Sequence, residues 1–368
     1  MGAFPAVDPI PLPAPVWLFK LLNVVTLVLH FYAVHFLVGG LFVALLWRML
    51  GSRRASAPML TGSDEIVRRL PLAMTYVINL GIPPLLFTQV LYGRALYTSS
   101  VLIGAWWIGV VFMVIFSYAL LYAMAKRADT NGAWGWIALV ALIVVIKIGA
   151  IYSSNMTLML RPEAWNAMYS ASGGGLYLPS GDPTLAPRWL YMMLGSVGVT
   201  GIALMFLPAR LDADHAARTL LRAWGGRILA IFTTIQIALG AWVFCSQPDA
   251  VRAGLTENSI YLIFIGLWFV TALATIGGGM AATYRAGYAT AIVCAAFSFV
   301  NVLAMVLVRD GIRDVALDAH GMNVWDREVV ANWSTIGLFL ILFVIAVGLV
   351  LWMGKVLMSA QRESAHYG

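Results

Sequence analysis

Two histidines lie in one long apolar stretch near the start of the chain. His30 and His35 fall near the middle of VWLFKLLNVVTLVLHFYAVHFLVGGLFVALLW (16–47), which is long enough to cross a bilayer with some tilt. An imidazole at bilayer depth is unfavourable unless it is paired, faces a cavity or binds a metal. Haem iron takes such a ligand in dry, helix-walled places. We therefore expect His30 to face a cofactor pocket; the alternative is a hydrogen bond to a neighbouring helix.

The two histidines should not bind the same iron. Each helical residue turns by about 100°, so His35, five residues after His30, points about 140° away from it. His35 is expected to face another helix or a haem propionate, with direct ligation as the alternative. The face of the stretch that carries His30 also carries Asn23 and Thr26.

The histidine count limits the haem content. The chain has five histidines, of which His215 and His366 fall in expected cytoplasmic segments and His320 in an outer loop. Two haems with two histidines each would need four buried histidines, which disfavours a two-haem cytochrome b. One haem bound by a single histidine, or by histidine and methionine, remains open.

A few other polar residues fall within apolar runs. Lys147 is an expected proton carrier or partner of a propionate, unless it reaches along a groove to water. The segment Gly-Ile-Pro-Pro (81–84) removes helical hydrogen bonds at mid-membrane, which fits a cavity wall. The uncharged polar side chains are expected to form interhelical hydrogen bonds, and Asn79, Gln89 and Asn155 are, with Lys147, also candidate contacts for protons or a quinone. The ones considered are Asn79, Gln89, Asn155, Gln236 and Asn301.

Composition defines the fold class. Of 368 residues, 61% are hydrophobic and 11% charged, and the mean hydropathy is +0.87. These values predict an all-α, polytopic membrane bundle in one domain over 1–368, because long unbroken apolar runs do not fit a β-barrel. The net charge of +7 indicates membrane topology rather than nucleic-acid binding. Two cysteines exclude a disulfide framework, an iron–sulfur cluster held by this chain alone and, with no CxxCH present, a c-type haem.

Nine membrane spans are expected. They are 16–47, 71–97, 100–125, 133–157, 189–209, 224–246, 259–283, 286–308 and 333–357. Lys and Arg number fourteen in the loops after odd-numbered spans and the C-terminal tail, against seven in the opposite loops. The positive-inside rule therefore predicts an outer N-terminus and a cytoplasmic C-terminus. The segments 158–188 and 309–332 are expected to be outer loops.

The segment TLVLHFYAVHFLVGG (26–40) resembles the first helix of subunit I of the cytochrome bd quinol oxidases. That family has Thr-x-x-x-His-Phe and a glycine nine residues after the histidine, as His30 is followed by Gly39. The resemblance implies that His30 is an axial ligand of the dioxygen-reducing haem pair. Shorter similarities follow in the same order along the chain. They are Gly-Ile-Pro at 81–83, Asn155 in SSNMTLMLRPEAW, the segment 222–244, and VRDGIR at 308–313.

The chain departs from this family at several positions. Met192 stands approximately where the family has a second haem-ligating histidine, and Phe264 near its ligating methionine. The third span has no acidic residue, and the family's long quinol-binding loop is reduced to 246–258. The resemblance thus implies a divergent member of this superfamily that keeps one haem position, with Met192 as a further ligand candidate.

The resulting hypothesis is an integral membrane electron-transfer subunit of a respiratory complex in the bacterial cytoplasmic membrane. It would bind one haem b and exchange electrons with a quinone or a periplasmic cytochrome c, alongside other membrane subunits. One alternative is a haem-free, quinone-binding membrane anchor, in which His30, His35 and Lys147 would contact the quinone. The other alternative is a proton-coupled transporter that uses the same buried groups as a relay.

Overall fold

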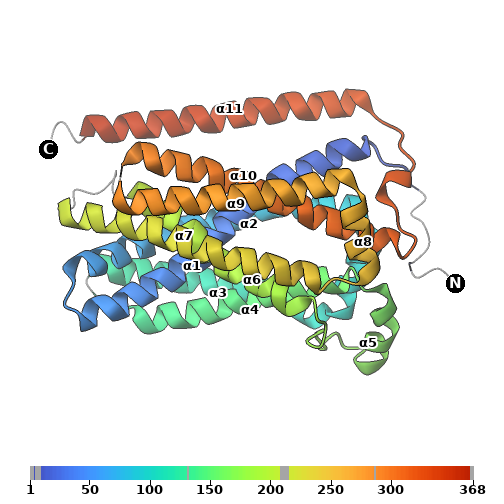
Figure 1. Ribbon diagram of the computed structural model, residues 1–368, viewed down its shortest axis with the longest axis horizontal. Helices are drawn as coiled ribbons and strands as arrows, with labels where there is room; N and C mark the ends of the chain where they lie inside the picture. The colour runs from blue at the N-terminus through green and yellow to red at the C-terminus, as the bar shows by residue number, and fades with distance from the viewer. Residues whose placement is uncertain (1–3, 5–9, 131, 208–214, 286, 365–368) are drawn as a thin grey trace. The chain divides into compact units, whose positions relative to one another are not determined.

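The computed structural model describes the chain except residues 1–3, 5–9, 131, 208–214, 286 and 365–368. Eleven α-helices make up most of the described residues (Figure 1). They are α1 (Val16–Arg53), α2 (Ala57–Leu102), α3 (Gly104–Asp129), α4 (Gly135–Leu158), α5 (Trp165–Ala171), α6 (Leu185–Phe206), α7 (His215–Cys245), α8 (Asp249–Glu257), α9 (Ser259–Tyr284), α10 (Tyr288–Asp318) and α11 (Trp333–Ser364). Two 3₁₀ turns cover Pro162–Ala164 and Val324–Asp326.

The helices confirm an all-α polytopic bundle. Eight described helices, α1–α4, α6, α7, α9 and α10, are long and apolar enough to cross a membrane. Each contains one of the first eight expected spans nearly in full. The ninth expected span lies in α11, where Trp333–Leu349 is apolar. Apolar side chains that face lipid explain why so many large hydrophobic residues are exposed in the isolated chain.

The chain divides into two compact units. The larger contains Met1–Val7 and Lys20–Val324, and the smaller contains Asp8–Phe19 and Trp325–Gly368. Within the smaller unit the backbone of Leu12 pairs with the segment before α11, through hydrogen bonds to Glu328 and Val330 of 2.8 and 3.0 Å. All residues considered below belong to the larger unit.

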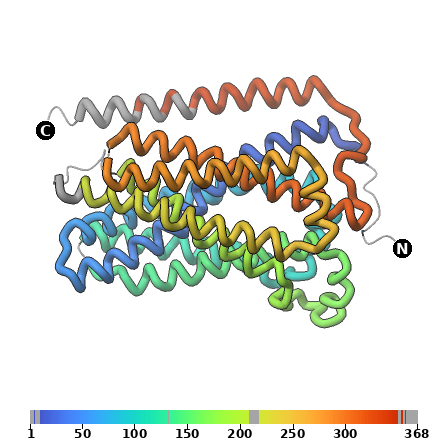
Figure 2. Tube along the Cα trace, in the orientation of Figure 1, coloured from blue at the N-terminus to red at the C-terminus, as the bar shows by residue number. Residues whose placement is uncertain are grey.

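Glycines set the closest helix contacts of the larger unit. A Cβ on Gly201 of α6 would lie 2.5 Å from the carbonyl oxygen of Gly225 in α7, and the converse distance is also 2.5 Å. Gly226 of α7 and Gly279 of α9 meet in the same way, at 2.5 and 2.8 Å. Small residues let helix backbones approach closely in a membrane. They therefore fix α7 between α6 and α9, and α10 packs in turn on α9 (Figure 2).

A further close contact joins α1 to α6. A Cβ on Gly39 would lie 2.1 Å from the carbonyl oxygen of Ser196 and 2.4 Å from the Thr200 hydroxyl. The hydroxyl of Thr200 also lies 3.4 Å from the backbone oxygen of His35. The second histidine of α1 is therefore positioned at the α1–α6 contact.

Helix α10 corrects one expected boundary. The span was expected to end at residue 308 and a charged outer loop to follow, but α10 continues to Asp318 and the connection begins after it. The extension is helical because its aspartates pair with Lys20 of α1 and Tyr92 of α2. The VRDGIR segment is thus part of a helix.

Candidate functional site

His30 lies against α2. A Cβ added to Gly81 would come within 2.9 Å of Cε1 and 3.1 Å of Nδ1 of His30, so the glycine leaves the space that the imidazole takes. Nδ1 is buried and has no direct hydrogen-bond partner, although the ring also interacts with the backbone of Val77, one turn before Gly81 on α2. Gly81 begins the Gly-Ile-Pro-Pro segment, where Pro83 and Pro84 remove backbone donors from α2. The predicted cavity-wall segment and the predicted ligand are therefore in contact.

His35 faces the opposite direction, into the interior of the larger unit. Its side chain is 4% exposed, and neither ring nitrogen has a hydrogen-bond partner. The ring of Phe31 stacks on that of His35 with centroids 5.8 Å apart, and its centroid lies 6.1 Å from that of His30. The two histidines thus meet different surroundings, as their five-residue spacing predicts, with Phe31 between them.

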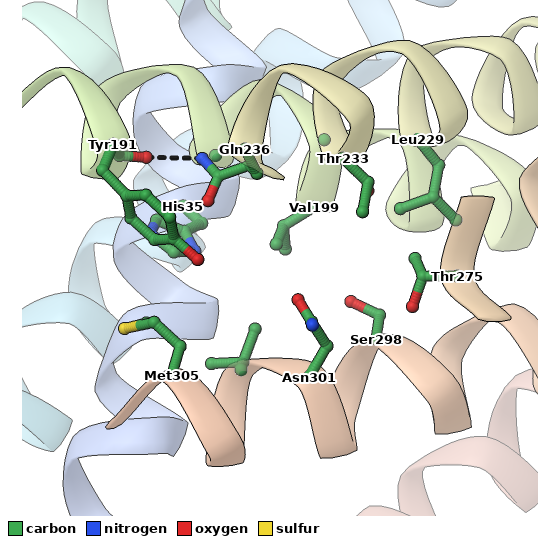
Figure 3. Close-up of a pocket in the computed structure, with 13 residues that line it drawn as sticks. His35, Tyr191, Val199, Leu229, Thr233, Gln236, Thr275, Ser298, Asn301 and Met305 are labelled. Atoms are coloured by element: carbon green, nitrogen blue, oxygen red, sulfur yellow. Dashed lines mark hydrogen bonds between the residues drawn. The ribbon is translucent and has the colours of Figure 1, made fainter. Parts of the chain in front are cut away.

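His35 is part of the wall of a small, partly open cavity between helices, here called the His35 cavity (Figure 3). The helices α1, α6, α7, α9 and α10 each contribute to it. Its lining residues are His35, Tyr191, Gly195, Gly198, Val199, Leu229, Thr233, Gln236, Thr275, Ser298, Asn301, Val302 and Met305. Its free volume of about 30 Å³ leaves room for about two water molecules.

The polar side chains of the wall are held in fixed orientations. Gln236 donates through Nε2 to the Tyr191 carbonyl oxygen at 2.6 Å, and Asn301 donates through Nδ2 to the Trp268 carbonyl oxygen at 2.8 Å. The Ser298 hydroxyl lies 3.1 Å from the Tyr32 hydroxyl. Neither Gln236 nor Asn301 was singled out for chemistry from the sequence, because their convergence depends on how α7 and α10 are placed around α1.

An arginine lies next to the two histidines. The Arg309 guanidinium carbon is 5.4 Å from the centroid of the Phe31 ring. Arg309 makes no salt bridge with any carboxylate in the described part of the chain. A positive charge without an ion-pair partner favours an anionic ligand group nearby.

Met192, the second predicted haem ligand, does not line the His35 cavity. It packs at the edge of an apolar cluster that includes Val24, Val28 and Phe31 of α1. A different methionine, Met305 of α10, lines the cavity. Whether Met192 binds a haem stays a prediction.

The predicted proton or quinone contacts lie apart from one another. The Lys147 ammonium is 4.3 Å from the centroid of the Trp106 ring. Asn79 is exposed and donates to the Thr75 carbonyl oxygen of its own helix at 2.8 Å. Asn155 is fully buried and donates to the Ser100 hydroxyl at 3.0 Å. Gln89 is half-buried on α2. None of these four residues lines the His35 cavity.

A buried charged cluster joins α1, α2 and α10. Lys20 pairs with Asp310 at 2.8 Å and with Asp314 at 2.5 Å. The Tyr92 hydroxyl donates to Asp314 at 2.7 Å, and Arg313 lies 3.4 Å from Asp310. These five residues are called the charged cluster below. Sequence reasoning missed it; the available signal was a lysine in the first apolar run and two aspartates four residues apart.

A second set of charges lies in the connections outside the spans. Glu163 interacts with Arg161, and its Oε2 lies 3.1 Å from Nε2 of His320. Partial burial raises the pKa of Glu163, but the Arg161 hydrogen bond and the Arg161 and His320 charges outweigh it and lower the pKa below its ordinary value. His320 is thus engaged in the connection that follows α10. His215 begins α7 but its side chain lies outside the described residues, as does His366.

Among the described residues, no group of three or more histidine, cysteine or carboxylate side chains is arranged to hold a metal ion. A haem needs fewer protein ligands, so this finding leaves the single imidazoles of α1 as the candidates. No protein-family model matches the chain, and no curated protein matches its sequence.

Proposed function

We propose that this protein is an electron-transfer subunit of a bacterial respiratory membrane complex, and that His30 binds a b-type haem. The observation that carries the proposal is the buried Nδ1 of His30, which has no hydrogen-bond partner inside a membrane-spanning helix. Leaving such a group unsatisfied costs about 1–3 kcal/mol, so its retention favours a ligand role. The proposal includes other membrane subunits and exchange of electrons with a quinone or a periplasmic cytochrome c.

The donor set near His30 fits a haem. An imidazole nitrogen is a common axial ligand of haem iron. The Arg309 guanidinium beside Phe31 offers a positive charge for a propionate group, and it has no carboxylate partner in the described chain. Gly81 has no side chain, so the backbone of α2 packs directly against the imidazole and fixes the position of the ring. A haem bound by these residues would supply a one-electron carrier.

The His35 cavity does not fit a haem. A cavity of about 150 Å³ is needed for a single benzene ring, and the space beside His35 is about 30 Å³. A porphyrin or a quinone head group therefore has no room there in this packing. The proposal accordingly assigns His30, and not His35, as the ligand, with Phe31 separating the two imidazoles.

The test is a pyridine haemochrome assay on the purified full-length protein and three variants. The wild type should contain haem, and His30→Ala should lose it. His35→Ala and His320→Ala should keep it, because one faces the small cavity and the other lies in the outer connection. Absence of haem from the wild type, or unchanged haem in His30→Ala, would contradict the proposal.

A fourth variant examines the methionine. If Met192 is the sixth ligand of the iron, Met192→Leu should retain haem but shift the reduced-state absorption bands. Unchanged spectra would assign Met192 to packing, which its place beside the Val24–Val28 cluster favours. Co-purification of redox partners with a haem-free chain would instead support the quinone-binding anchor, and substrate uptake into proteoliposomes without redox activity would support the transporter.

A further inference from the structure

The His35 cavity is a small, partly open space between five helices, lined by both polar and apolar side chains, and it has no role in the haem proposal. The free volume of this cavity limits the size of the molecule that it can bind. With about 30 Å³ free, it admits about two water molecules and excludes aromatic rings. The occupant must therefore be very small.

The imidazole of His35 requires a partner that both donates and accepts. A neutral imidazole has one N–H donor and one acceptor nitrogen. Both nitrogens of His35 are buried and unpartnered, and the side chain is 4% exposed. Phe31 covers the ring face and satisfies neither nitrogen. Water is the smallest molecule that can satisfy both.

The rest of the wall offers mainly acceptors. The amide nitrogens of Gln236 and Asn301 are used by backbone carbonyl oxygens, so their own oxygens turn toward the cavity, as Figure 3 shows. The oxygens of Thr275 and Ser298 also point toward it. The Tyr191 hydroxyl accepts from the Trp268 indole at 2.9 Å, which leaves its own hydrogen to donate. Such a wall matches water molecules, which donate two hydrogen bonds each.

Electrostatics argues against a metal cation as the occupant. None of the cavity-lining residues of the described chain carries a carboxylate. The titratable or charged groups that face His35 are Tyr191 from α6, His30 from its own helix, and Arg309 of α10 through Phe31. The lining residues from α7 and α9 are not titratable. A metal cation would therefore lack the anionic oxygen ligands that hard cations prefer.

We propose that the His35 cavity binds about two water molecules, which join the His35 imidazole to the oxygen-lined wall. These water molecules then satisfy both the donor and the acceptor nitrogen of the His35 imidazole inside the bundle. Water in this place also accounts for the polar side chains that five different helices direct at one point. This inference does not depend on whether His30 binds a haem.

The first test uses the sign of a stability change. Val199→Ile and Val302→Ile each add one methyl group to the cavity wall. If the cavity is dry, filling it should raise the apparent unfolding temperature of the full-length protein in nanodiscs. If it holds water, the double variant should lower that temperature by a few degrees, because the added methyl groups displace water and leave His35 unsatisfied. A rise would overturn the proposal.

A matched control separates hydration from overpacking. Val197→Ile adds the same methyl group to the neighbouring apolar core, where Val197 is 4% exposed and the surroundings are hydrocarbon. In a His35→Leu background, where no imidazole needs water, the cavity-filling pair should no longer destabilise the protein, whereas overpacking would persist. Persistence of the loss would overturn the proposal.

The second test is direct. A high-resolution cryo-electron microscopy map of the wild-type protein in nanodiscs should show density for water within hydrogen-bond distance of both ring nitrogens of His35. Density for a larger molecule, or an empty cavity, would overturn the proposal. Histidine-labelled protein gives the same answer by NMR, because a hydrated His35 ring proton exchanges with D₂O rapidly and a sealed one does not.

Discussion

The charged cluster and the His35 cavity both include residues of α1 and α10, but they differ in whether their polar groups have partners. Lys20 and His35 both belong to α1, about 22 Å apart along the helix, and Asp310 and Asn301 both belong to α10. In the charged cluster each charge faces an opposite charge at 2.5–3.4 Å. In the cavity, the imidazole has no partner at all within the described chain.

Paired polar groups hold the helices together, whereas buried polar groups without a partner are candidates for binding a ligand. One lysine and one arginine face two aspartates, so the charged cluster has no net charge. Its contacts tie α1, α2 and α10 together. Satisfied networks of this kind make one helix arrangement strongly preferred. Neither ring nitrogen of His35 has a partner, and His30 has an unpartnered Nδ1 besides its interaction with the Val77 backbone, so both imidazoles are better candidates for binding.

The largest expected effect follows from breaking the charged cluster. Asp314→Ala removes the carboxylate that pairs with Lys20 at 2.5 Å and accepts from Tyr92 at 2.7 Å. Removing one partner leaves a buried charge poorly compensated, which costs about 3–5 kcal/mol. Unfolding of the variant in mixed micelles should show this loss relative to the wild type.

Asp249→Ala is the matched control for that measurement. Asp249 also pairs with an arginine, Arg252, but its side chain is 92% exposed. Its removal should change stability by less than about 1 kcal/mol. Equal losses for the two aspartate variants would mean that the cluster is hydrated and does not hold the helices together.

An intermediate effect is expected at the cavity wall. Asn301→Leu removes hydrogen bonds to the Trp268 carbonyl oxygen and the Thr271 hydroxyl, at 2.8 and 3.2 Å, and one acceptor of the cavity. The expected loss is about 1 kcal/mol in the same unfolding measurement. Asn79→Leu is the control, because exposed Asn79 bonds only within its own helix, and it should cost nothing measurable.

If Asn79→Leu proved as damaging as Asn301→Leu, the contrast between cavity and surface would fail. Such a result would also return Asn79 to consideration as a contact for a quinone or a partner subunit. Equal and negligible effects would instead mean that the cavity wall makes no contribution to helix association.

The fold was largely predictable from the sequence, and the reason is local. Unbroken apolar runs of membrane length give each helix independently of its neighbours. The first eight expected spans therefore match eight described helices of membrane length, and the ninth lies in α11, whose described apolar part is shorter. The predicted end of this span at residue 308 was wrong, because Asp310 and Asp314 were interpreted as loop residues and α10 continues to Asp318. Their helical state depends on Lys20, almost 300 positions earlier in the chain, and no local pattern contains that pairing.

The candidate site was predictable in part. Helical geometry separates His30 from His35. The Gly81 segment, expected to be a cavity wall, contacts His30 but does not line the His35 cavity. The His35 cavity could not be predicted. It requires the side chains of Gln236 and Asn301 to converge, and that convergence is set by the glycine contacts between α6, α7 and α9.

The smallest expected effect lies outside both regions, at the ionic contact of Glu163 with Arg161 and His320. Because the pKa of Glu163 is lowered in the folded protein, its contribution to stability is present above its unfolded pKa of about 4.3 and is lost as the pH falls through the lower folded value. The contact is partly exposed, so we expect less than about 1 kcal/mol. Unfolding temperatures from pH 7 to pH 3 should fall slightly more for the wild type than for Glu163→Gln. Parallel curves would show that solvent screens this contact completely, and that charge pairs stabilise this chain only where they are buried.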